Sequence, residues 1–351
     1  MRPSPNTVGI LGTSGYAGQV LHALLMQHPC IRPVTIHGRG PADAGPREVE
    51  RLAECDAVAL ALPREASREW VAALKLATGD SMPKIIDLSD AFRLDAPNNE
   101  DARAALRSTD AGVELPKIHY GLPELYGAPT PATEIVANPG CYPTATLLVL
   151  RPLLEAGLVE LSHLAVAGAS GASGAGKGIA DHLHFCNLSE NVFPYKVGEH
   201  RHQPEIERHL GHGATISFVT TLLPIVRGLQ VTAFVAPKAG VTPTMLRDAL
   251  VERYRDHRWV TVLQSPDQGL GLRHVVGSHQ GVLGVGPTQS SGLVPVFSSI
   301  DNLMRGAASQ AVHNLNLWFG LFAGMGLPAP LEAPAGTPSA STSVTTQLLY
   351  A

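Results

Sequence analysis

Cys141 differs from the other three cysteines in the turn that precedes it. It follows Asn-Pro-Gly (138–140) and precedes an apolar run that predicts a helix over residues 145–154. The dipole and free N–H groups of a helix N-terminus lower the pKa of a thiol and favour the reactive thiolate. A buried structural role is the usual fate of a cysteine, and it suits those that follow no such turn: Cys30, Cys55 and Cys186. We therefore predict that Cys141 is a nucleophile.

A thiol nucleophile needs a nearby group that carries protons. Residues 198–206 read Gly-Glu-His-Arg-His-Gln-Pro-Glu-Ile and bring together two imidazoles, a guanidinium and two carboxylates. His200 and His202 could also form a metal pair, but no third ligand stands at a usable spacing, so we expect no metal. A chance cluster among the 15 histidines is the alternative. Arg201 suits a carboxylate or a phosphate on a substrate.

A glycine-rich turn stands near the start of the chain. Residues 9–18 read Gly-Ile-Leu-Gly-Thr-Ser-Gly-Tyr-Ala-Gly, between a short apolar run and a stretch with helical spacing. Glycines three apart let backbone N–H groups approach a pyrophosphate at the positive end of the helix. Strand-to-helix turns favour glycine in any case, so the interpretation depends on this context. We predict that a dinucleotide binds here.

The second expected strand helps to choose between NAD and NADP. An NAD site usually ends this strand with Asp or Glu, which holds the ribose 2′-hydroxyl. Residues 36–40 read Ile-His-Gly-Arg-Gly and carry no carboxylate. Arg39, with His37 close by, could face the 2′-phosphate of NADP; the alternative is a surface arginine in a loop. We expect NADP.

A third glycine-rich stretch, residues 168–177, superficially resembles a phosphate loop. It lacks the four-residue gap before Gly-Lys-Ser/Thr, and Lys177 is followed by Gly178. We expect a loop of small residues at a domain cleft, where a nicotinamide can approach closely.

The elements that must position these residues change in character near residue 143. Before it, short apolar strands alternate with helical stretches, which predicts a parallel sheet covered on both faces. The clearest elements are strands at 7–11, 31–36, 57–62 and 84–88 and a helix at 17–27. After it, strands dominate, which indicates an α+β domain with a largely antiparallel or mixed sheet. These strands are expected at 165–167, 215–221, 230–235 and 281–285, with helices at 243–254 and 301–317.

The composition excludes several classes of protein. A formal net charge of −4 gives no reason to expect nucleic acid or an anionic membrane as a partner. No apolar stretch reaches the roughly 18 residues that a membrane span requires. The first residues run directly into a strand, which leaves no room for a signal peptide, and Cys-x-x-Cys pairs are absent. We expect a cytoplasmic protein with reduced cysteines.

Seven segments, in order, carry a family resemblance. They read GILGTSGYAG, DLSDAFRL, YGLPELY, ANPGCYPT, SGASGAGK, GEHRHQPEI and DNLMRGAASQAV. On these segments, which span residues 8–317, the chain resembles the N-acetyl-gamma-glutamyl-phosphate reductases of arginine biosynthesis, relatives of aspartate-semialdehyde dehydrogenase. The resemblance implies NADPH-dependent reduction of N-acetyl-L-glutamyl 5-phosphate to N-acetyl-L-glutamate 5-semialdehyde through a thioester on Cys141.

The resemblance also implies a domain organisation. A Rossmann NADP-binding domain is expected at residues 1–143, and an α+β catalytic and dimerisation domain of the semialdehyde-dehydrogenase type at 144–300. A C-terminal helix at 301–326 should return to the first domain. Residues 327–351, rich in Pro, Ala, Ser and Thr, are expected to form a mobile tail. Members of the family usually form homodimers or homotetramers.

Family positions assign roles to residues of this sequence. Cys141 matches the nucleophile and His202 the acid/base histidine, with His200 its close competitor. The residues expected to bind substrate are His200, Arg201 and Glu205. Those expected to bind the cofactor are Gly12, Thr13, Ser14, Gly15, Tyr16, Ala17, Arg39, Ser173, Gly174 and Asn302.

Three stretches depart from the family pattern. The segment between residues 39 and 57 is short and lacks the Ser/Arg-rich run expected around a 2′-phosphate. Residues 63–67 read Pro-Arg-Glu-Ala-Ser in place of Pro-His-Gly-Val-Ser. Residues 221–228 read Thr-Leu-Leu-Pro-Ile-Val-Arg-Gly, close to the usual Pro-Met-Asn-Arg-Gly. The first two departures lie where the cofactor is expected.

Two alternatives accompany this hypothesis. A carrier-protein-linked aminoadipyl-phosphate reductase of lysine biosynthesis tends to carry Gly-Cys-Asn-Ala and Thr-Ala-Glu. This chain has Gly-Cys-Tyr-Pro (140–143) and Gln-Pro-Glu (203–205) at those places, which favours arginine biosynthesis. A non-catalytic NADP-sensing protein would show erosion of the nucleophile or of the histidine cluster, and neither is eroded.

Overall fold

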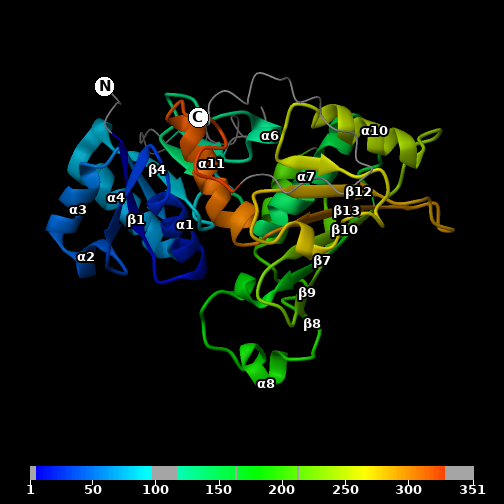
Figure 1. Ribbon diagram of the computed structural model, residues 1–351, viewed down its shortest axis with the longest axis horizontal. Coiled ribbons are helices and arrows are strands. Elements are labelled where there is room, and N and C mark those ends of the chain that lie inside the picture. The colour runs from blue at the N-terminus through cyan, green and yellow to red at the C-terminus, as the bar shows by residue number, and fades with distance from the viewer. Residues whose placement is uncertain (1–4, 97–116, 163, 212, 329–351) are drawn as a thin grey trace.

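The computed structural model describes residues 5–96, 117–162, 164–211 and 213–328. The chain forms two sheets that lie side by side, and helix α11 lies between them (Figure 1). Most of the predicted tail, residues 329–351, lies outside the described residues. In the described part of the chain, no helix is both long and apolar enough to cross a membrane.

The first sheet is parallel throughout and has the order β2-β1-β3-β4-β6-β5. Every residue of β3 is buried, as the expected two-sided cover requires. The strands are β1 (Asn6–Leu11), β2 (Ile31–Ile36), β3 (Ala57–Leu60), β4 (Lys84–Asp87), β5 (Ile118–Tyr120) and β6 (Ile135–Ala137). The prediction of a parallel Rossmann-type sheet is confirmed.

The glycine loop lies where the strand order of this sheet reverses. β2 pairs with one edge of β1 and β3 with the other, and ligands bind beside such a switch point. The helices around this sheet are α1 (Tyr16–Met26), α2 (Pro41–Ala44), α3 (Pro46–Ala53), α4 (Arg64–Thr78), η1 (Gly79–Ser81) and α6 (Pro123–Tyr126).

The second sheet is mixed, with the order β11-β12-β13-β10-β7-β9-β8. Two strand pairs, β7/β9 and β11/β12, are parallel and the others antiparallel, which confirms the predicted α+β architecture. The strands are β7 (Leu164–Gly171), β8 (Phe193–Tyr195), β9 (Ile216–Leu223), β10 (Leu229–Val235), β11 (Val260–Val262), β12 (Gly281–Val285) and β13 (Val294–Ile300).

Helix α7 (Cys141–Glu155) covers one face of the second sheet and packs against β10 and β13. It begins four residues before the predicted start, so Cys141 is its first residue. Pro143 fits in the first turn of the helix because the N–H of that position has no intrahelical partner. Beside α7 lie α9 (His202–Leu210) and α10 (Pro243–Arg253). Shorter helices are η3 (Ala172–Ala175), η4 (Asp181–Leu183), α8 (Phe185–Leu188) and η5 (Leu272–His274).

The predicted helix at 301–317 is divided into two parts. A π-helical stretch, η6 (Met304–Ala308), precedes α11 (Ser309–Trp318). Asp301 Oδ1 accepts hydrogen bonds from the N–H groups of Leu303 and Met304 at 2.8 and 3.0 Å, as the side chain of a helix N-cap does. α11 packs with α1 on the first sheet in one apolar cluster, which includes Val8, Ile10, Leu21, Ile86, Val312 and Leu315.

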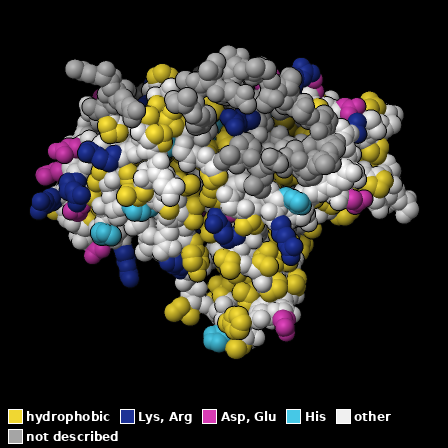
Figure 2. Space-filling model, viewed as in Figure 1, with side chains coloured by type: hydrophobic (Ala, Val, Ile, Leu, Met, Phe, Trp, Pro, Cys, Tyr) yellow, Lys and Arg dark blue, Asp and Glu magenta, His cyan; other side chains and the backbone are white. Residues whose placement is uncertain are grey.

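Residues 176–192, which contain α8, form an arm that projects from the second sheet (Figure 1). Apolar side chains are exposed along it: Ile179 is 105% and Phe185 77% exposed. Hydrophobic side chains gather around α8 at the bottom of the view in Figure 2.

Candidate active site

The glycine loop forms a backbone cradle that only glycine permits. Gly12 has a φ of +85°, and a Cβ built on it would lie 2.2 Å from the carbonyl oxygen of Ala61. A Cβ on Gly18 would lie 2.2 Å from the carbonyl oxygen of Gly12. The loop therefore lies directly against the end of β3 and opens α1. This geometry fits the pyrophosphate of a dinucleotide.

The predicted cofactor residues line two cavities. A cavity of about 500 Å³ is lined by Gly12, Thr13, Ser14, Gly15 and Arg39, among others. A second, of about 540 Å³, brings Tyr16 of the first part together with Ser173 and Lys177 of the second. The Lys177 Nζ lies 5.1 Å from the centroid of the Tyr16 ring. Ala17 is the second residue of α1.

Asn302 holds the Ser173 turn in place. Its Nδ2 donates to Ser173 Oγ at 2.9 Å, and its Oδ1 accepts from the Gly228 N–H at 2.8 Å. The side chain is buried, at 3% exposed. The predicted contact of Asn302 with the cofactor stays a prediction, and these bonds indicate that it acts through Ser173.

Cys141 lines a third cavity, of about 290 Å³, together with Gly174 and the predicted substrate residues His200, Arg201 and His202. The Ser173-Gly174 turn thus joins the second cavity to the thiol. Arm residues Ile179, Ala180, His182 and Leu183 complete the lining. The structure therefore brings the predicted nucleophile, the histidine pair and the glycine-rich turn to one place.

The turn before Cys141 is clamped by a buried ion pair. Arg93 Nη1 lies 3.1 Å from Glu205 Oε2, and both side chains are at most 5% exposed. Arg93 Nε also donates to the Asn138 carbonyl at 2.8 Å. Glu205 Oε1 accepts from the Gly140 N–H at 3.0 Å and from the Tyr120 hydroxyl at 2.8 Å. Both Glu205 oxygens are thus engaged with the protein. Substrate binding by Glu205 stays a prediction, and these contacts favour a positioning role.

His202 packs directly on this turn. A Cβ built on Gly140 would lie 2.5 Å from His202 Nε2, so glycine is needed for the approach. The His202 backbone N–H donates to His200 Nδ1 at 3.2 Å, which leaves the proton of neutral His200 on Nε2. His202 Nδ1 is buried without a hydrogen-bond partner among the described residues.

The Cys141 thiol and the imidazoles of His200 and His202 are uncharged at neutral pH. Burial raises the pKa of the Cys141 thiol to about 11, and it outweighs the Tyr142 N–H and Arg201, which lower it. The expectation that the helix N-terminus gives a low thiol pKa is therefore wrong here, because desolvation is the larger effect. Burial, and then Arg93, hold the pKa of His202 well below its usual value. Burial lowers the pKa of His200 to about 4, with Lys196 and Arg201 acting in the same direction. The thiol thus shares its cavity with two neutral imidazoles, a form that can accept a proton.

Arg201 is the most accessible predicted substrate residue. Its side chain is 59% exposed, and its guanidinium lies 4.0 Å from Asp90. Asp90 is bound more closely by Arg64, through contacts of 3.2 and 3.0 Å. Arg64 belongs to the segment that departs from the family pattern, so this departure supplies Asp90 with a second cation. Arg201 remains free to turn into the cavity.

Sequence reasoning missed three groups at the site. Arg93 stands in a recognised motif, but its partner Glu205 is 112 residues away. Lys196 lines the cavity with a φ of +48°, unusual for a lysine. Tyr142 and Tyr195 meet the His200 ring edge-on, at 5.3 and 5.7 Å between centroids. The signal that could have identified Lys196 is its position, because it is a titratable residue shortly before the His-Arg-His segment.

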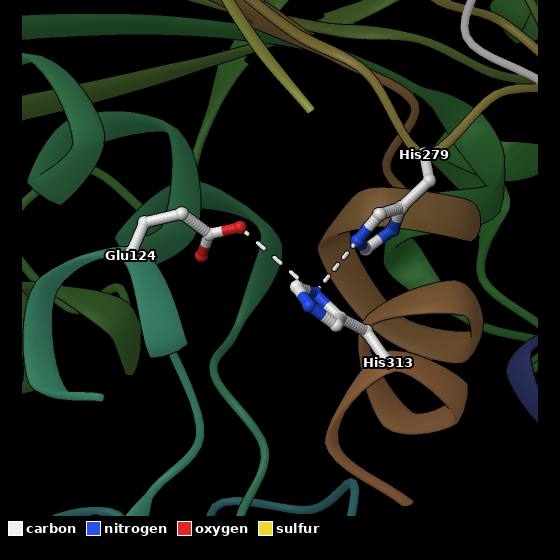
Figure 3. Close-up of side chains that lie close together, drawn as sticks. All are labelled: Glu124, His279 and His313. Carbon is white, nitrogen blue, oxygen red and sulfur yellow. Dashed lines mark hydrogen bonds and ion pairs between the residues drawn. The ribbon is translucent and has the colours of Figure 1, made fainter. Parts of the chain in front are cut away.

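A second cluster resembles a metal site by proximity. Glu124, His279 and His313 are buried and place their ligand atoms within 4.8 Å of one another (Figure 3). The guanidinium of Arg305 lies among them, with Nη2 2.6 Å from Glu124 Oε1 and Nη1 donating to His279 Nε2. A permanent cation therefore occupies the electron pairs that a metal ion would need.

Two family models match the chain. One, described as the semialdehyde dehydrogenase NAD binding domain, matches residues 7–130, and the dimerisation domain of the same family matches residues 141–302. Among curated relatives, the N-acetyl-gamma-glutamyl-phosphate reductase of Desulforudis audaxviator is 37% identical, over 92% of this chain and 98% of the relative. The reductase of that name from Geobacillus thermodenitrificans is 38% identical, over 89% and 95%.

Solved structures share the fold at low identity. Aspartate semialdehyde dehydrogenase II of Vibrio cholerae, complexed with ASA, superposes with a TM-score of 0.65 at 17% identity, over 91% of this chain and 99% of that chain. The Candida albicans enzyme with NADP gives 0.59 at 15% identity, over 88% and 96%. Taken with the sequence relatives, the cradle and the Cys141 cavity, these likenesses show that the chain belongs to the N-acetyl-gamma-glutamyl-phosphate reductase family of semialdehyde dehydrogenases.

Proposed function

We propose that this chain reduces N-acetyl-L-glutamyl 5-phosphate to N-acetyl-L-glutamate 5-semialdehyde and phosphate, with NADPH as cofactor, in arginine biosynthesis. The observation that supports this most is the shared cavity of Cys141, His200, Arg201 and His202, joined to the dinucleotide cradle through Ser173-Gly174. The names of the relatives and the Gly-Cys-Tyr-Pro and Gln-Pro-Glu segments favour this substrate over a carrier-bound aminoadipyl phosphate.

The first step is acyl transfer to sulfur. The Cys141 thiol gives its proton to His202, and the sulfur attacks the acyl carbon. The bond between that carbon and the phosphate oxygen breaks, and phosphate leaves with the proton. The N-termini of α7 and α9 both reach the cavity, so their dipoles favour the anionic substrate.

The second step is reduction of the thioester. When bound, NADPH supplies the hydride. His202, after taking up a proton from solvent, delivers it to the carbonyl oxygen, which gives a thiohemiacetal on Cys141. The carbon–sulfur bond then breaks, and the hydroxyl proton returns to sulfur through His202. A thioester suits this sequence because the thiolate is a good leaving group.

The reverse reaction tests this assignment. We expect NADP⁺ reduction with N-acetylglutamate 5-semialdehyde to require phosphate, and Cys141→Ala to abolish it while cofactor binding persists. Aspartate semialdehyde and NAD⁺ in the same assay test substrate and cofactor. Turnover that is independent of phosphate, or substantial activity of Cys141→Ala, would overturn the proposal.

We further propose that the chain works as a homodimer or homotetramer in the cytoplasm. α7 covers one face of the second sheet, while alternate residues of β7, β9 and β10 point to the other face. Ala167 pairs with Val219 and Thr232 across this face, and Val219 is 42% exposed. A second copy would bury this row and extend over the apolar arm. The four cysteines are all free, as a reducing compartment would keep them.

The oligomer can be tested by light scattering coupled to size exclusion. We expect Val219→Asp to shift the protein towards monomer, because a charge on a buried apolar interface is costly. Ser217→Asp, on the same strand and face but closer to its end, is a milder comparison. An unchanged mass for Val219→Asp would contradict this interface.

A further inference from the structure

The cavity beside the glycine loop contains a carboxylate that the sequence alone did not place there. This cavity lies between the loop, the end of β2 and the residues after β3. In such folds the groups that follow the second strand contact the adenosine ribose and decide between its 2′-hydroxyl and its 2′-phosphate. Arg39 is in this position, and Asp43 of α2 lines the same cavity.

Asp43 is held beside Arg39 by a specific turn. Its Oδ2 accepts a hydrogen bond from the Arg39 backbone N–H at 3.0 Å. Gly38 has a φ of +144°, and a Cβ on it would lie 2.7 Å from the Ala44 Cβ. Glycine at this position lets α2 fold back onto the end of β2. The carboxylate missing from the strand itself is thus supplied by the following helix.

A second acidic side chain approaches the same loop. Glu69 of α4 lies so close that a Cβ built on Gly40 would be 3.0 Å from its Oε2. The loop after β2 therefore carries one arginine, with one carboxylate bound to its backbone N–H and a second beside Gly40. A 2′-phosphate is attracted by Arg39 and repelled by Asp43, whereas a ribose hydroxyl can donate to the carboxylate.

We infer that Asp43 is a cofactor-selectivity residue that makes this chain accept NADH alongside NADPH. The inference deepens the proposed cofactor site and does not depend on the proposed reaction. Asp43 opposes the phosphate that Arg39 binds, so the two cofactors should differ in affinity by no more than about tenfold.

Titration of the full chain with NADPH and with NADH, followed by cofactor fluorescence without substrate, tests this inference. Asp43→Asn keeps an oxygen that can accept the Arg39 N–H bond but removes the charge. We expect it to tighten NADPH binding and weaken NADH binding, which shifts the affinity ratio by about tenfold. Arg39→Met should shift the ratio the other way.

Two controls separate charge from folding. Asp43→Ala also loses the hydrogen bond to the Arg39 N–H. If Asp43 had only a structural role, Asp43→Ala would weaken the binding of both cofactors equally, and Asp43→Asn would bind both as the wild type does. Glu50→Gln removes an exposed carboxylate from neighbouring α3 and should leave the ratio unchanged. An unchanged ratio in Asp43→Asn, or a wild-type preference for NADPH beyond about tenfold, would overturn the inference. Failure of both cofactors to bind would instead contradict the proposed cofactor site.

Discussion

Two histidine–arginine clusters in this molecule have similar composition and opposite accessibility. The first cluster, which we propose to be catalytic and call the catalytic cluster, consists of Cys141, His200, Arg201 and His202. It lines a cavity, and Arg201 is largely exposed. The sealed cluster, Glu124, His279, Arg305 and His313, is closed, and Arg305 is 0% exposed. In the catalytic cluster, His202 Nδ1 lacks a partner among the described residues. In the sealed cluster, His279 Nδ1 is hydrogen-bonded to Ser309 Oγ at 2.7 Å, and its Nε2 accepts a hydrogen bond from Arg305 Nη1.

The comparison shows that residue type alone does not make a reactive site. Burial is the largest single influence on the pKa of Glu124 and raises it, but Arg305, His313 and a backbone hydrogen bond together outweigh burial and hold that pKa at about 2. Every strong charge in the sealed cluster is compensated inside the protein. In the catalytic cluster, Arg201 and the neutral imidazoles line a cavity. There a bound ligand would supply the hydrogen-bond and charge partners that the protein does not. Access to a cavity separates the two clusters, because the Cys141 group lines one whereas Arg305 is fully buried.

The sealed cluster also supports the catalytic one. Arg305 belongs to η6, and its neighbour Gly306 lies against the proposed nucleophile, since a Cβ on Gly306 would be 2.5 Å from the Cys141 Cβ. Because Arg305 fixes η6, it helps to fix the wall behind Cys141. π-Helical stretches are frequent at functional sites, and this one joins a structural cluster to a reactive one.

The largest expected effect distinguishes one histidine in each cluster. His202→Asn should lower kcat by about 10²- to 10⁴-fold, the usual contribution of a general acid–base group, with little change in stability. His279→Asn should leave kcat of the folded enzyme nearly unchanged but cost about 1–3 kcal/mol of unfolding free energy. Steady-state kinetics and urea unfolding measure both. Equal loss of kcat in the two variants would remove the distinction.

The arginines sharpen the same contrast. Arg305→Met leaves Glu124 buried without its cation and should reduce the unfolding free energy by about 3–5 kcal/mol. Arg201→Met should change stability by less than about 1 kcal/mol, because an exposed ion pair contributes little, while raising KM for the acyl substrate. Arg201→Lys is the matched control that retains charge. A stable Arg305→Met protein would refute the claim that Arg305 stabilises the sealed cluster.

Acid should weaken both clusters through their histidines. Burial lowers the pKa of His200 to about 4, and lowers that of His313 to about 4 with Arg305 acting in the same direction. The unfolded chain then binds more protons below about pH 6.5, so stability is present above that pH and lost as pH falls towards 4. At about pH 5 the lowered pKa of each histidine reduces the free energy of unfolding by about 2 kcal/mol. The reduction is smaller for His200, because its cavity admits water.

Urea unfolding at neutral pH and at about pH 5 checks this dependence. His313→Asn should reduce the loss of stability on acidification, and His200→Asn should reduce it less. Parallel pH profiles for wild type and both variants would show that these histidines do not sense pH as described.

The smallest expected effect concerns Lys196, which lines only the catalytic cavity. Lys196→Asn tolerates the positive φ and removes the charge, so the fold should persist while KM for the acyl phosphate rises about tenfold. Lys196→Arg should restore most of the affinity. A KM unaffected by Lys196→Asn would place this lysine outside the binding site.

Local patterns predicted the parts of the site that depend on local structure. The glycine loop lies between the strand and the helix that its pattern predicted, and Cys141 lies at a helix N-terminus as expected. The His-Arg-His segment was recognised by its composition, but helix α9, which begins at His202, was not predicted. The contacts of Arg93 and of Arg305 join residues far apart in the chain, so spacing could not reveal them. The thiol pKa was predicted in the wrong direction because the sequence shows the helix N-terminus but not the burial. Asp43 was missed because its carboxylate reaches the end of β2 from the next helix.

The most direct test of the central claim traps the acyl group on Cys141. Wild-type enzyme with NADP⁺ and N-acetylglutamate 5-semialdehyde, but without phosphate, should form one equivalent of NADPH and then stall at the thioester. Mass spectrometry should find one N-acetylglutamyl group on the peptide that contains Cys141, and added phosphate should remove it. Absence of the NADPH burst, or an adduct that persists in Cys141→Ala, would contradict the account.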